Sequence, residues 1–206
     1  MSNLRTYTVA PTPTAGLIQN PVAGCTNWRV SRWCPSRNYI KNPSFEYDTA
    51  GWAARTPGGG NFIQRTYLSV YSGAYACWAA SSGAAFPGIT YDLGYLISGN
   101  QGKTFTLSVA VNPNAAQILT LNVIAAAGSD RLLGTVTRDI VCGWERLEVV
   151  FAIPNTSDYG TAVTGLYFEI TTLVNGPFYV DSAMIVEGAK PNILYFDGDE
   201  LRVLSE

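Results

Sequence analysis

The feature that most constrains the fold is a strict alternation of residue types between positions 103 and 111. Phe105, Leu107, Val109 and Val111 occupy alternate positions, and the residues between them are threonine, serine or alanine. Successive side chains of a β-strand point to opposite faces, so a period of two is typical of a half-buried strand. This stretch therefore predicts a strand whose apolar face lies against a core.

The same period recurs along most of the chain, between short runs of turn-forming residues. Further apolar residues at alternate positions are Leu119, Leu121 and Val123, then Leu147, Val149 and Phe151, then Leu166, Phe168 and Ile170. No long stretch has the period of a helix. About nine or ten strands without long helices predict an all-β protein with two antiparallel sheets packed face to face.

A family resemblance begins with the run Asn-Tyr-Ile-Lys-Asn-Pro-Ser-Phe-Glu at residues 38–46, which is closed by Gly51-Trp52. This run is similar to the opening of family 4/9/22-type carbohydrate-binding modules. Four more segments follow in the family's order, at residues 71–76, 102–108, 143–147 and 178–181. The resemblance covers residues 38–188 and implies a galactose-binding-like jelly-roll sandwich, without specifying a sugar.

The resemblance leaves two appendages, one at each end of the predicted jelly roll. Residues 1–37 are interrupted by prolines and glycines, yet they carry Trp28 and Trp33 among other large apolar residues. A disordered tail is poor in such residues, so an extended arm is predicted. It either makes assembly contacts with a neighbouring subunit or folds back over its own domain. Residues 189–206 are predicted to form a short C-terminal tail.

A second, shorter resemblance lies in that tail. Tyr195-Phe196-Asp197-Gly198-Asp199, following such a module, is similar to a segment of tailed-phage minor tail proteins. It implies a virion component that is synthesised in the host cytoplasm. The N-terminus fits this expectation, because it lacks the apolar core of a signal peptide.

Charge and composition exclude several classes of function. The net charge is −2 and no long basic run occurs, so no nucleic-acid partner is expected. No stretch of about 18 apolar residues is present, so membrane insertion is not expected either. The chain has no histidine, which excludes histidine-based catalytic triads, and its carboxylates are scattered. A non-enzymatic protein that requires no cofactor is therefore predicted.

Four cysteines, at positions 25, 34, 77 and 142, form no pair with the spacing of a zinc site. Cys25 and Cys34 are close enough in sequence to close a small loop in an oxidising compartment. The sequence leaves open whether these two residues are bridged.

The carbohydrate-binding resemblance also implies a structural Ca²⁺. By position, Glu46 and Asp181 match the family's acidic residues after its opening run and in its closing strand. Calcium takes six to eight oxygen ligands, so two carboxylates with backbone carbonyls would suit it. A second acidic residue of the family is replaced here by Ser182. The alternative is that Glu46 and Asp181 are ordinary polar residues at the rim of the sandwich.

Glycan binding needs exposed aromatic rings beside polar side chains. Trp78 is the leading candidate because its position alternates with those of Tyr75 and Cys77, so it points outward if they point inward. The full set of glycan candidates is Trp78, Tyr67, Tyr71, Tyr91, Tyr95, Arg65 and Gln64. An outward aromatic residue can equally anchor a protein contact.

Together these features predict a structural or adhesion component of a tailed-phage virion, similar to a minor tail protein. Its expected partners are other virion subunits, further copies of itself in a homo-oligomer, and host-surface polysaccharide. One alternative is a purely architectural capsid decoration or tail-tip protein without sugar binding. Another is a free lectin-like carbohydrate-binding protein.

Overall fold

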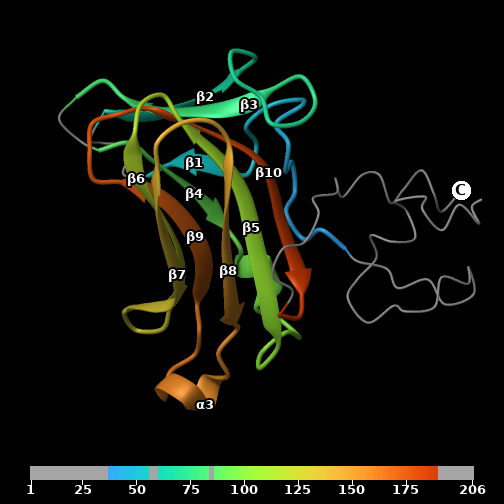
Figure 1. The fold of residues 1–206 in the computed structure, drawn as a ribbon. Coiled ribbons are helices and arrows are strands. Elements are labelled where there is room, and N and C mark those ends of the chain that lie inside the picture. The colour runs from blue at the N-terminus through green and yellow to red at the C-terminus, as the bar shows by residue number, and fades with distance from the viewer. Residues whose placement is uncertain (1–36, 56–59, 84–85, 190–206) are drawn as a thin grey trace, which may run out of the picture. The chain divides into compact units, whose positions relative to one another are not determined.

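The computed structural model describes residues 37–55, 60–83 and 86–189 (Figure 1). The arm predicted for residues 1–37 and the tail predicted for residues 189–206 lie almost entirely outside these ranges. Cys25, Cys34 and the Tyr195–Asp199 segment also lie outside them. The interpretations of these segments therefore stay predictions.

Two five-stranded sheets make up the described chain. Sheet A has the order β1 (Trp52–Ala54), β4 (Gly88–Asp92), β9 (Gly165–Thr172), β6 (Gln117–Ala126) and β7 (Asp130–Ile140). Sheet B has the order β2 (Asn61–Thr66), β3 (Ala76–Ser81), β10 (Phe178–Glu187), β5 (Thr104–Pro113) and β8 (Glu145–Ala152). Every neighbouring pair is antiparallel. The predicted jelly-roll sandwich is confirmed.

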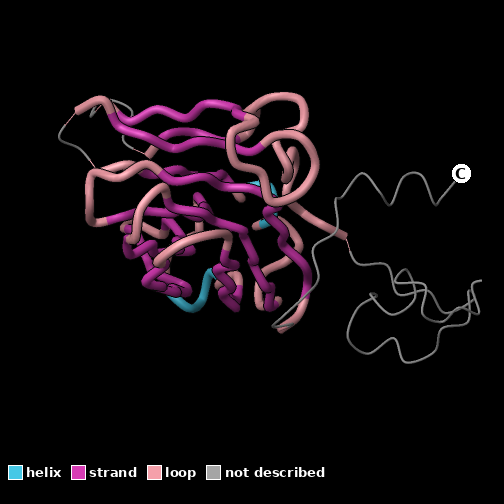
Figure 2. The backbone as a smooth tube through the Cα atoms, turned by 45° about the horizontal axis from the view of Figure 1, so that its top comes forward, coloured by secondary structure: helices cyan, strands magenta, loops and turns pink. Residues whose placement is uncertain are grey.

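Helical structure in the described ranges is limited to short turns, cyan in Figure 2. They are η3 (Gly94–Leu96) and α3 (Thr156–Tyr159), and neither was predicted from the sequence. Among the described residues, no helix has the length and apolar character needed to cross a membrane.

The core lies between the sheets and follows the alternation read from the sequence. Phe105, Leu107, Val109 and Val111 of β5 are all fully buried in it. The alternate residues of each strand therefore face outward, on the two outer faces of the sandwich. This parity decides which side chains are available to a ligand.

The opening run at residues 38–46 lies alongside β10. The amide of Tyr39 donates to the carbonyl of Ile185 at 3.0 Å, and the Asn38 side chain donates to the carbonyl of Ala183 at 3.0 Å. Phe45 and Trp52 both enter the core, with ring centroids 4.8 Å apart. This segment thus closes the sandwich beside β10 and connects to β1 at the edge of sheet A.

Candidate functional site

The outer face of sheet A carries a row of polar side chains that crosses four strands. Antiparallel register places Thr90 of β4 beside Glu169 of β9, Glu169 beside Asn122 of β6, and Asn122 beside Thr135 of β7. Apolar residues precede and follow Glu169 and Asn122, and those neighbours are buried in the core. The row therefore points away from the core, as strand alternation requires.

Glu169 is the centre of a hydrogen-bonded array across this face. Arg55, directly after β1, donates from Nε to one carboxylate oxygen at 2.6 Å. Asn122 donates from Nδ2 to the other oxygen at 3.3 Å. The hydroxyl of Thr135 then donates to Oδ1 of Asn122 at 2.8 Å, which fixes the orientation of that amide. The hydrogen bonds thus join three parts of the chain that are far apart in sequence, namely Arg55, the β6–β7 hairpin and β9.

A glycine allows Arg55 to reach Glu169 across the intervening strand. A Cβ atom added to Gly88 of β4 would lie 2.9 Å from Cβ and 3.1 Å from Cδ of Arg55. The arginine side chain therefore lies directly over Gly88. The Arg55 side chain is 45% exposed. Among the described residues, no hydrogen-bond partner is found for its terminal nitrogens. These nitrogens are available to a ligand.

Tyr167 adds an aromatic ring to the same face, two residues before Glu169 on β9. Its hydroxyl donates to Oδ2 of Asp130 at 3.1 Å. Burial raises the pKa of Tyr167, and the hydrogen bond to Asp130 raises it further. The phenol therefore stays protonated at neutral pH. Arg55 also contributes to the electrostatic environment of this hydroxyl, so the ring belongs to the same charged neighbourhood.

We call Arg55, Asn122, Thr135, Tyr167 and Glu169 the sheet A array. Each carboxylate oxygen of Glu169 accepts one hydrogen bond within it, and a carboxylate has about four lone-pair positions. The array therefore offers charged donors, unused acceptor positions and one ring on a preorganised sheet. This combination suits a ligand with neighbouring hydroxyl groups and an apolar ring face.

The sequence candidates Trp78 and Gln64 lie instead on the outer face of sheet B. Register places Trp78 between Gln64 of β2 and Tyr179 of β10. Trp78 points away from the core, as the alternation predicts, because Cys77 and Ala79 are the buried residues of β3. Its ring meets Phe62 edge-on at 5.4 Å between centroids.

Tyr91 was wrongly predicted to be available to a glycan. It is 2% exposed and packs in the core against Trp52 and Phe168. Its hydroxyl accepts from the amide of Lys41 at 2.8 Å. The reason is parity, since Tyr91 shares the inward side of β4 with Ile89. Tyr95 is partly exposed, but it follows β4 in the η3 turn, where its hydroxyl donates to the carbonyl of Tyr39.

Three further candidates lie near the loop at residues 67–75. Arg65 donates from Nε to the carbonyl of Phe45 at 2.8 Å, and its guanidinium lies 3.2 Å from the ring centroid of Tyr75. These contacts hold the opening run in place. Tyr67 and Tyr71 are exposed side chains of the loop itself. The seven predicted residues thus do not converge on one site.

The predicted calcium ligands hold the same loop by its amide groups. Glu46 accepts through Oε1 from the amides of Ala74 at 2.9 Å and Tyr75 at 3.3 Å. Asp181 accepts through Oδ2 from the amides of Tyr71 at 2.9 Å and Ser72 at 3.0 Å. A calcium site needs oxygen atoms around the cation, whereas here N–H groups point at both carboxylates.

As arranged, these residues therefore do not fit a calcium ion. Among the described residues, no group of three or more histidine, cysteine, aspartate or glutamate side chains is suited to a metal. Burial raises the pKa of Asp181 to about 6, against the opposing effect of its backbone hydrogen bonds. Structural Ca²⁺ stays a prediction of the family resemblance.

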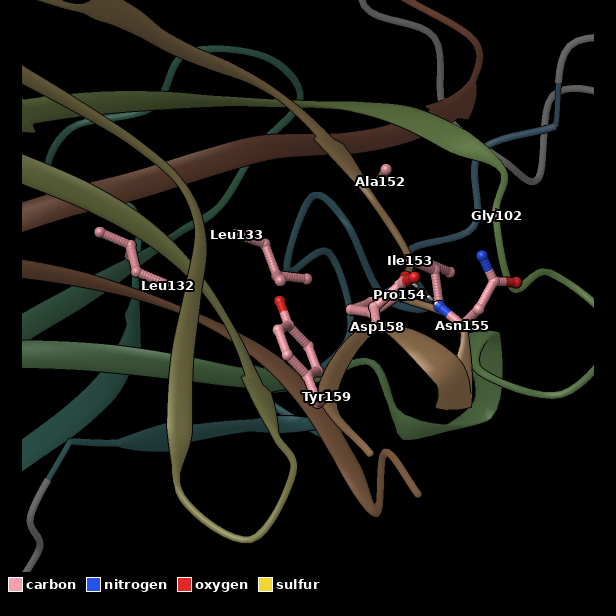
Figure 3. A pocket seen from close by; sticks show the side chains of 9 residues that line it. All are labelled: Gly102, Leu132, Leu133, Ala152, Ile153, Pro154, Asn155, Asp158 and Tyr159. Carbon is pink, nitrogen blue, oxygen red and sulfur yellow. Dashed lines mark hydrogen bonds between the residues drawn. The ribbon is translucent and has the colours of Figure 1, made fainter. Parts of the chain in front are cut away.

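A hollow of about 390 Å³ lies beside α3 at one end of the sandwich (Figure 3). Leu132, Leu133, Ile153 and Tyr159 line part of it with apolar side chains, and Asn155 and Asp158 line another part. Its polar side chains are used locally, because Asn155 and Asp158 cap α3 through reciprocal hydrogen bonds. It therefore lacks the convergent free polar groups that the sheet A array has.

None of the five residues of the sheet A array was predicted from the sequence. One signal was present, since Glu169 is a charged residue in the middle of a strand whose alternate residues are apolar. Its partner Arg55 is 114 residues away in sequence, so no local pattern joins them.

No protein-family model matches the sequence, and no curated protein matches it. Solved structures do resemble it. One is the C-terminal family 22 carbohydrate-binding module of Clostridium thermocellum Xyn10B, with a TM-score of 0.59 and 19% identity over 77% of this chain and 96% of that one. Another is the second family 22 xylan-binding domain of Paenibacillus barcinonensis Xyn10C, with a TM-score of 0.58 and 19% identity over 71% and 98%.

Enzymes also share this architecture. A Stig cyclase from Fischerella sp. TAU, solved with an indole-containing ligand, matches with a TM-score of 0.56 and 15% identity over 75% of this chain and 98% of that one. At these identities the likeness establishes the fold alone. The described domain therefore has a jelly-roll fold like that of carbohydrate-binding modules, and its non-enzymatic character stays a prediction.

Proposed function

We propose that this domain binds a polysaccharide on the outer face of sheet A. The observation that carries the proposal is the array around Glu169, in which Arg55 and Asn122 orient a carboxylate at the centre of the sheet face. The xylan-binding domain of Paenibacillus barcinonensis, which has the same fold, supports a polysaccharide as the class of ligand.

The energetics favour a binding role for Glu169 over a stabilising one. Its residue surface is only 8% exposed, so its charge is largely desolvated. A buried ion pair contributes little net stability after that cost, and apolar residues of similar size often serve equally well. A half-exposed arginine beside a shielded carboxylate is, however, well placed to exchange hydrogen bonds with a sugar's hydroxyl groups.

The extent of the array suits a chain rather than a single sugar. Tyr167 lies two residues before Glu169 on β9, so its ring and the carboxylate are about 7 Å apart along the strand, and the polar row continues beside them on β6 and β7. More than one sugar unit fits over this area. The ring of Tyr167 would stack against one of them, and Arg55, Glu169 and Asn122 would bind its hydroxyls.

Isothermal titration with soluble xylan, mixed-linkage glucan and isolated bacterial cell-wall polysaccharide tests the proposal. Arg55→Ala and Tyr167→Ala should each weaken binding by about tenfold or more, since each removes a direct ligand contact. Trp78→Ala is the control on the opposite sheet and should bind normally. If Trp78→Ala loses binding and Arg55→Ala keeps it, the site lies on sheet B instead.

We further propose that this binding serves host adhesion by a tailed-phage virion, in which the chain contacts other virion subunits and copies of itself. Support comes from the resemblance of Tyr195–Asp199 to minor tail proteins. Purified virions should carry the chain, and an antibody against the jelly roll should block attachment to host cells. If the antibody labels virions but leaves attachment unchanged, the role is architectural.

A further inference from the structure

Three exposed apolar side chains lie beyond the sheet A array on the same face, at one end of β4, β9 and β6. Continuing the register by two residues from the Gly88–Thr171 pair places Phe86 beside Leu173. Continuing it by one residue from the Leu119–Thr172 pair places Ile118 beside Leu173. Ile118 points outward by strand alternation, and Phe86 and Leu173 lie just beyond the ends of β4 and β9. We call Phe86, Ile118 and Leu173 the apolar row.

The apolar row is exposed to an extent that needs a reason. Phe86, Ile118 and Leu173 are 48%, 43% and 71% exposed. The adjacent positions on the same face carry no apolar side chain, namely Gly88, Thr120, Thr171 and the charged Asp139, which pairs with Ile118. Leu173 lies four residues beyond Glu169, or about 13 Å along the strand direction. A chain bound at the sheet A array and running along β9 would therefore reach the apolar row.

The backbone beneath the apolar row is held by hydrogen bonds. Asn61 donates from Nδ2 to the carbonyl of Phe86 at 2.9 Å. Thr172 donates to Gln117 at 2.9 Å and accepts from the amide of Val174 at 3.2 Å, which fixes the turn on which Leu173 lies. A ligand would meet a surface that is already ordered, so binding would cost little conformational entropy.

The chemistry of the row indicates what it would bind. Unlike Phe86, Ile118 and Leu173 present no flat ring to a bare pyranose, and they would desolvate its hydroxyls without replacing their hydrogen bonds. An acyl methyl group has no hydrogen bonds to lose. A second protein copy is disfavoured, because three side chains fall well short of the roughly 800 Å² that each partner buries in a stable interface.

We propose that the apolar row binds acyl groups, such as O-acetyl groups, carried by a polysaccharide that lies on the sheet A array. This inference rests on the proposed function and specifies the class of polysaccharide that the site would bind. The protein would then prefer an acetylated chain over the same chain without its acetyl groups. Burial of one methyl group corresponds to about a fourfold gain in affinity.

The test compares acetylated xylan with the same xylan after mild alkaline deacetylation, titrated into the full chain. The wild type should bind the acetylated form about fourfold or more tightly, and the double variant Ile118→Thr, Leu173→Ser should bind both forms equally. Leu68→Ser is the matched control, because Leu68 is 73% exposed in a loop away from sheet A. It should keep the preference.

The outcomes separate this inference from the proposed function. Equal binding of both xylans by the wild type, or a preference that survives in the double variant, would overturn the role of the apolar row alone. Lack of binding to either form, or undiminished binding of both by Arg55→Ala, would overturn the site itself and with it this inference. A dimer that only the double variant dissociates in analytical ultracentrifugation would assign the row to contacts between copies, against the proposal.

Discussion

Glu169 and Phe168 are adjacent on β9, yet their side chains lie on opposite faces of sheet A and have opposite roles. Phe168 is fully buried in the core, and Glu169 lies on the outer face with Arg55. Replacing each in turn should therefore separate stability from binding. Phe168→Ala should lower the free energy of unfolding by about 3–5 kcal/mol, the usual cost of a large aromatic truncation in a core.

Glu169→Gln should lower the free energy of unfolding by only about 1 kcal/mol or less. The amide keeps an oxygen to accept from Asn122, so that hydrogen bond is retained. The ion pair with Arg55 is lost, but the Arg55 side chain is 45% exposed and becomes hydrated instead of being left as a buried charge. Polysaccharide affinity should nevertheless fall by about tenfold, because the ligand loses a charged acceptor.

The assay is urea unfolding followed by tryptophan fluorescence, since Trp52 lies in the core close to Phe168. Calorimetric titration of the same samples gives their affinity. If Glu169→Gln costs more than about 3 kcal/mol, the carboxylate is a structural element and the reasoning fails. Normal affinity in a stable Glu169→Gln protein would refute it equally.

Three further predictions follow from the structure. Gly88→Ala should displace the Arg55 side chain, because the new Cβ would lie 2.9 Å from Cβ of Arg55. Polysaccharide binding should therefore weaken by about tenfold in calorimetric titration. Unchanged affinity would mean that Arg55 does not contact the polysaccharide. Since burial raises the pKa of Asp181 from 3.8 to about 6, this carboxyl group stabilises the fold below about pH 4 and loses that effect as pH rises through 6. Thermal unfolding should show a fall in wild-type stability on the order of 3 kcal/mol across this window, which Asp181→Asn should lack. Chelation of divalent cations should leave the melting temperature unchanged, because amide groups already satisfy Glu46 and Asp181, and a drop would instead support the calcium site.

The sequence was sufficient for the fold because alternation is a local property. Phe105, Leu107, Val109 and Val111 read as one face of a strand, and they are buried on that face. The outward orientation of Trp78 followed from the same rule. Tyr91 was misplaced although its own strand contains the needed signal, since the buried Ile89 has the same parity.

The site depends instead on sheet order, which no single segment reveals. Arg55 reaches Glu169 only because β4 lies between β1 and β9 and carries Gly88 at the crossing point. Asn122 joins them because β6 is the next neighbour of β9. Three segments that are remote in sequence must be assembled before their polar side chains can be recognised as one array.

The calcium prediction has a different origin. It transferred two acidic positions from a family resemblance without the geometry around them. In the structure, the amides of Tyr71 and Ser72 point at Asp181, and those of Ala74 and Tyr75 point at Glu46. The loop conformation, and not the identity of the acidic residues, decides whether oxygen or N–H groups face the carboxylates.

The most direct test of the central claim is a map of amide chemical shifts during titration of the ¹⁵N-labelled protein with a soluble polysaccharide that it binds. If the polysaccharide binds at the sheet A array, the shifts should concentrate on β4, β9, β6 and β7, with Thr90, Asn122 and Glu169 among the largest. Shifts concentrated instead around Gln64 and Trp78 on sheet B would contradict it.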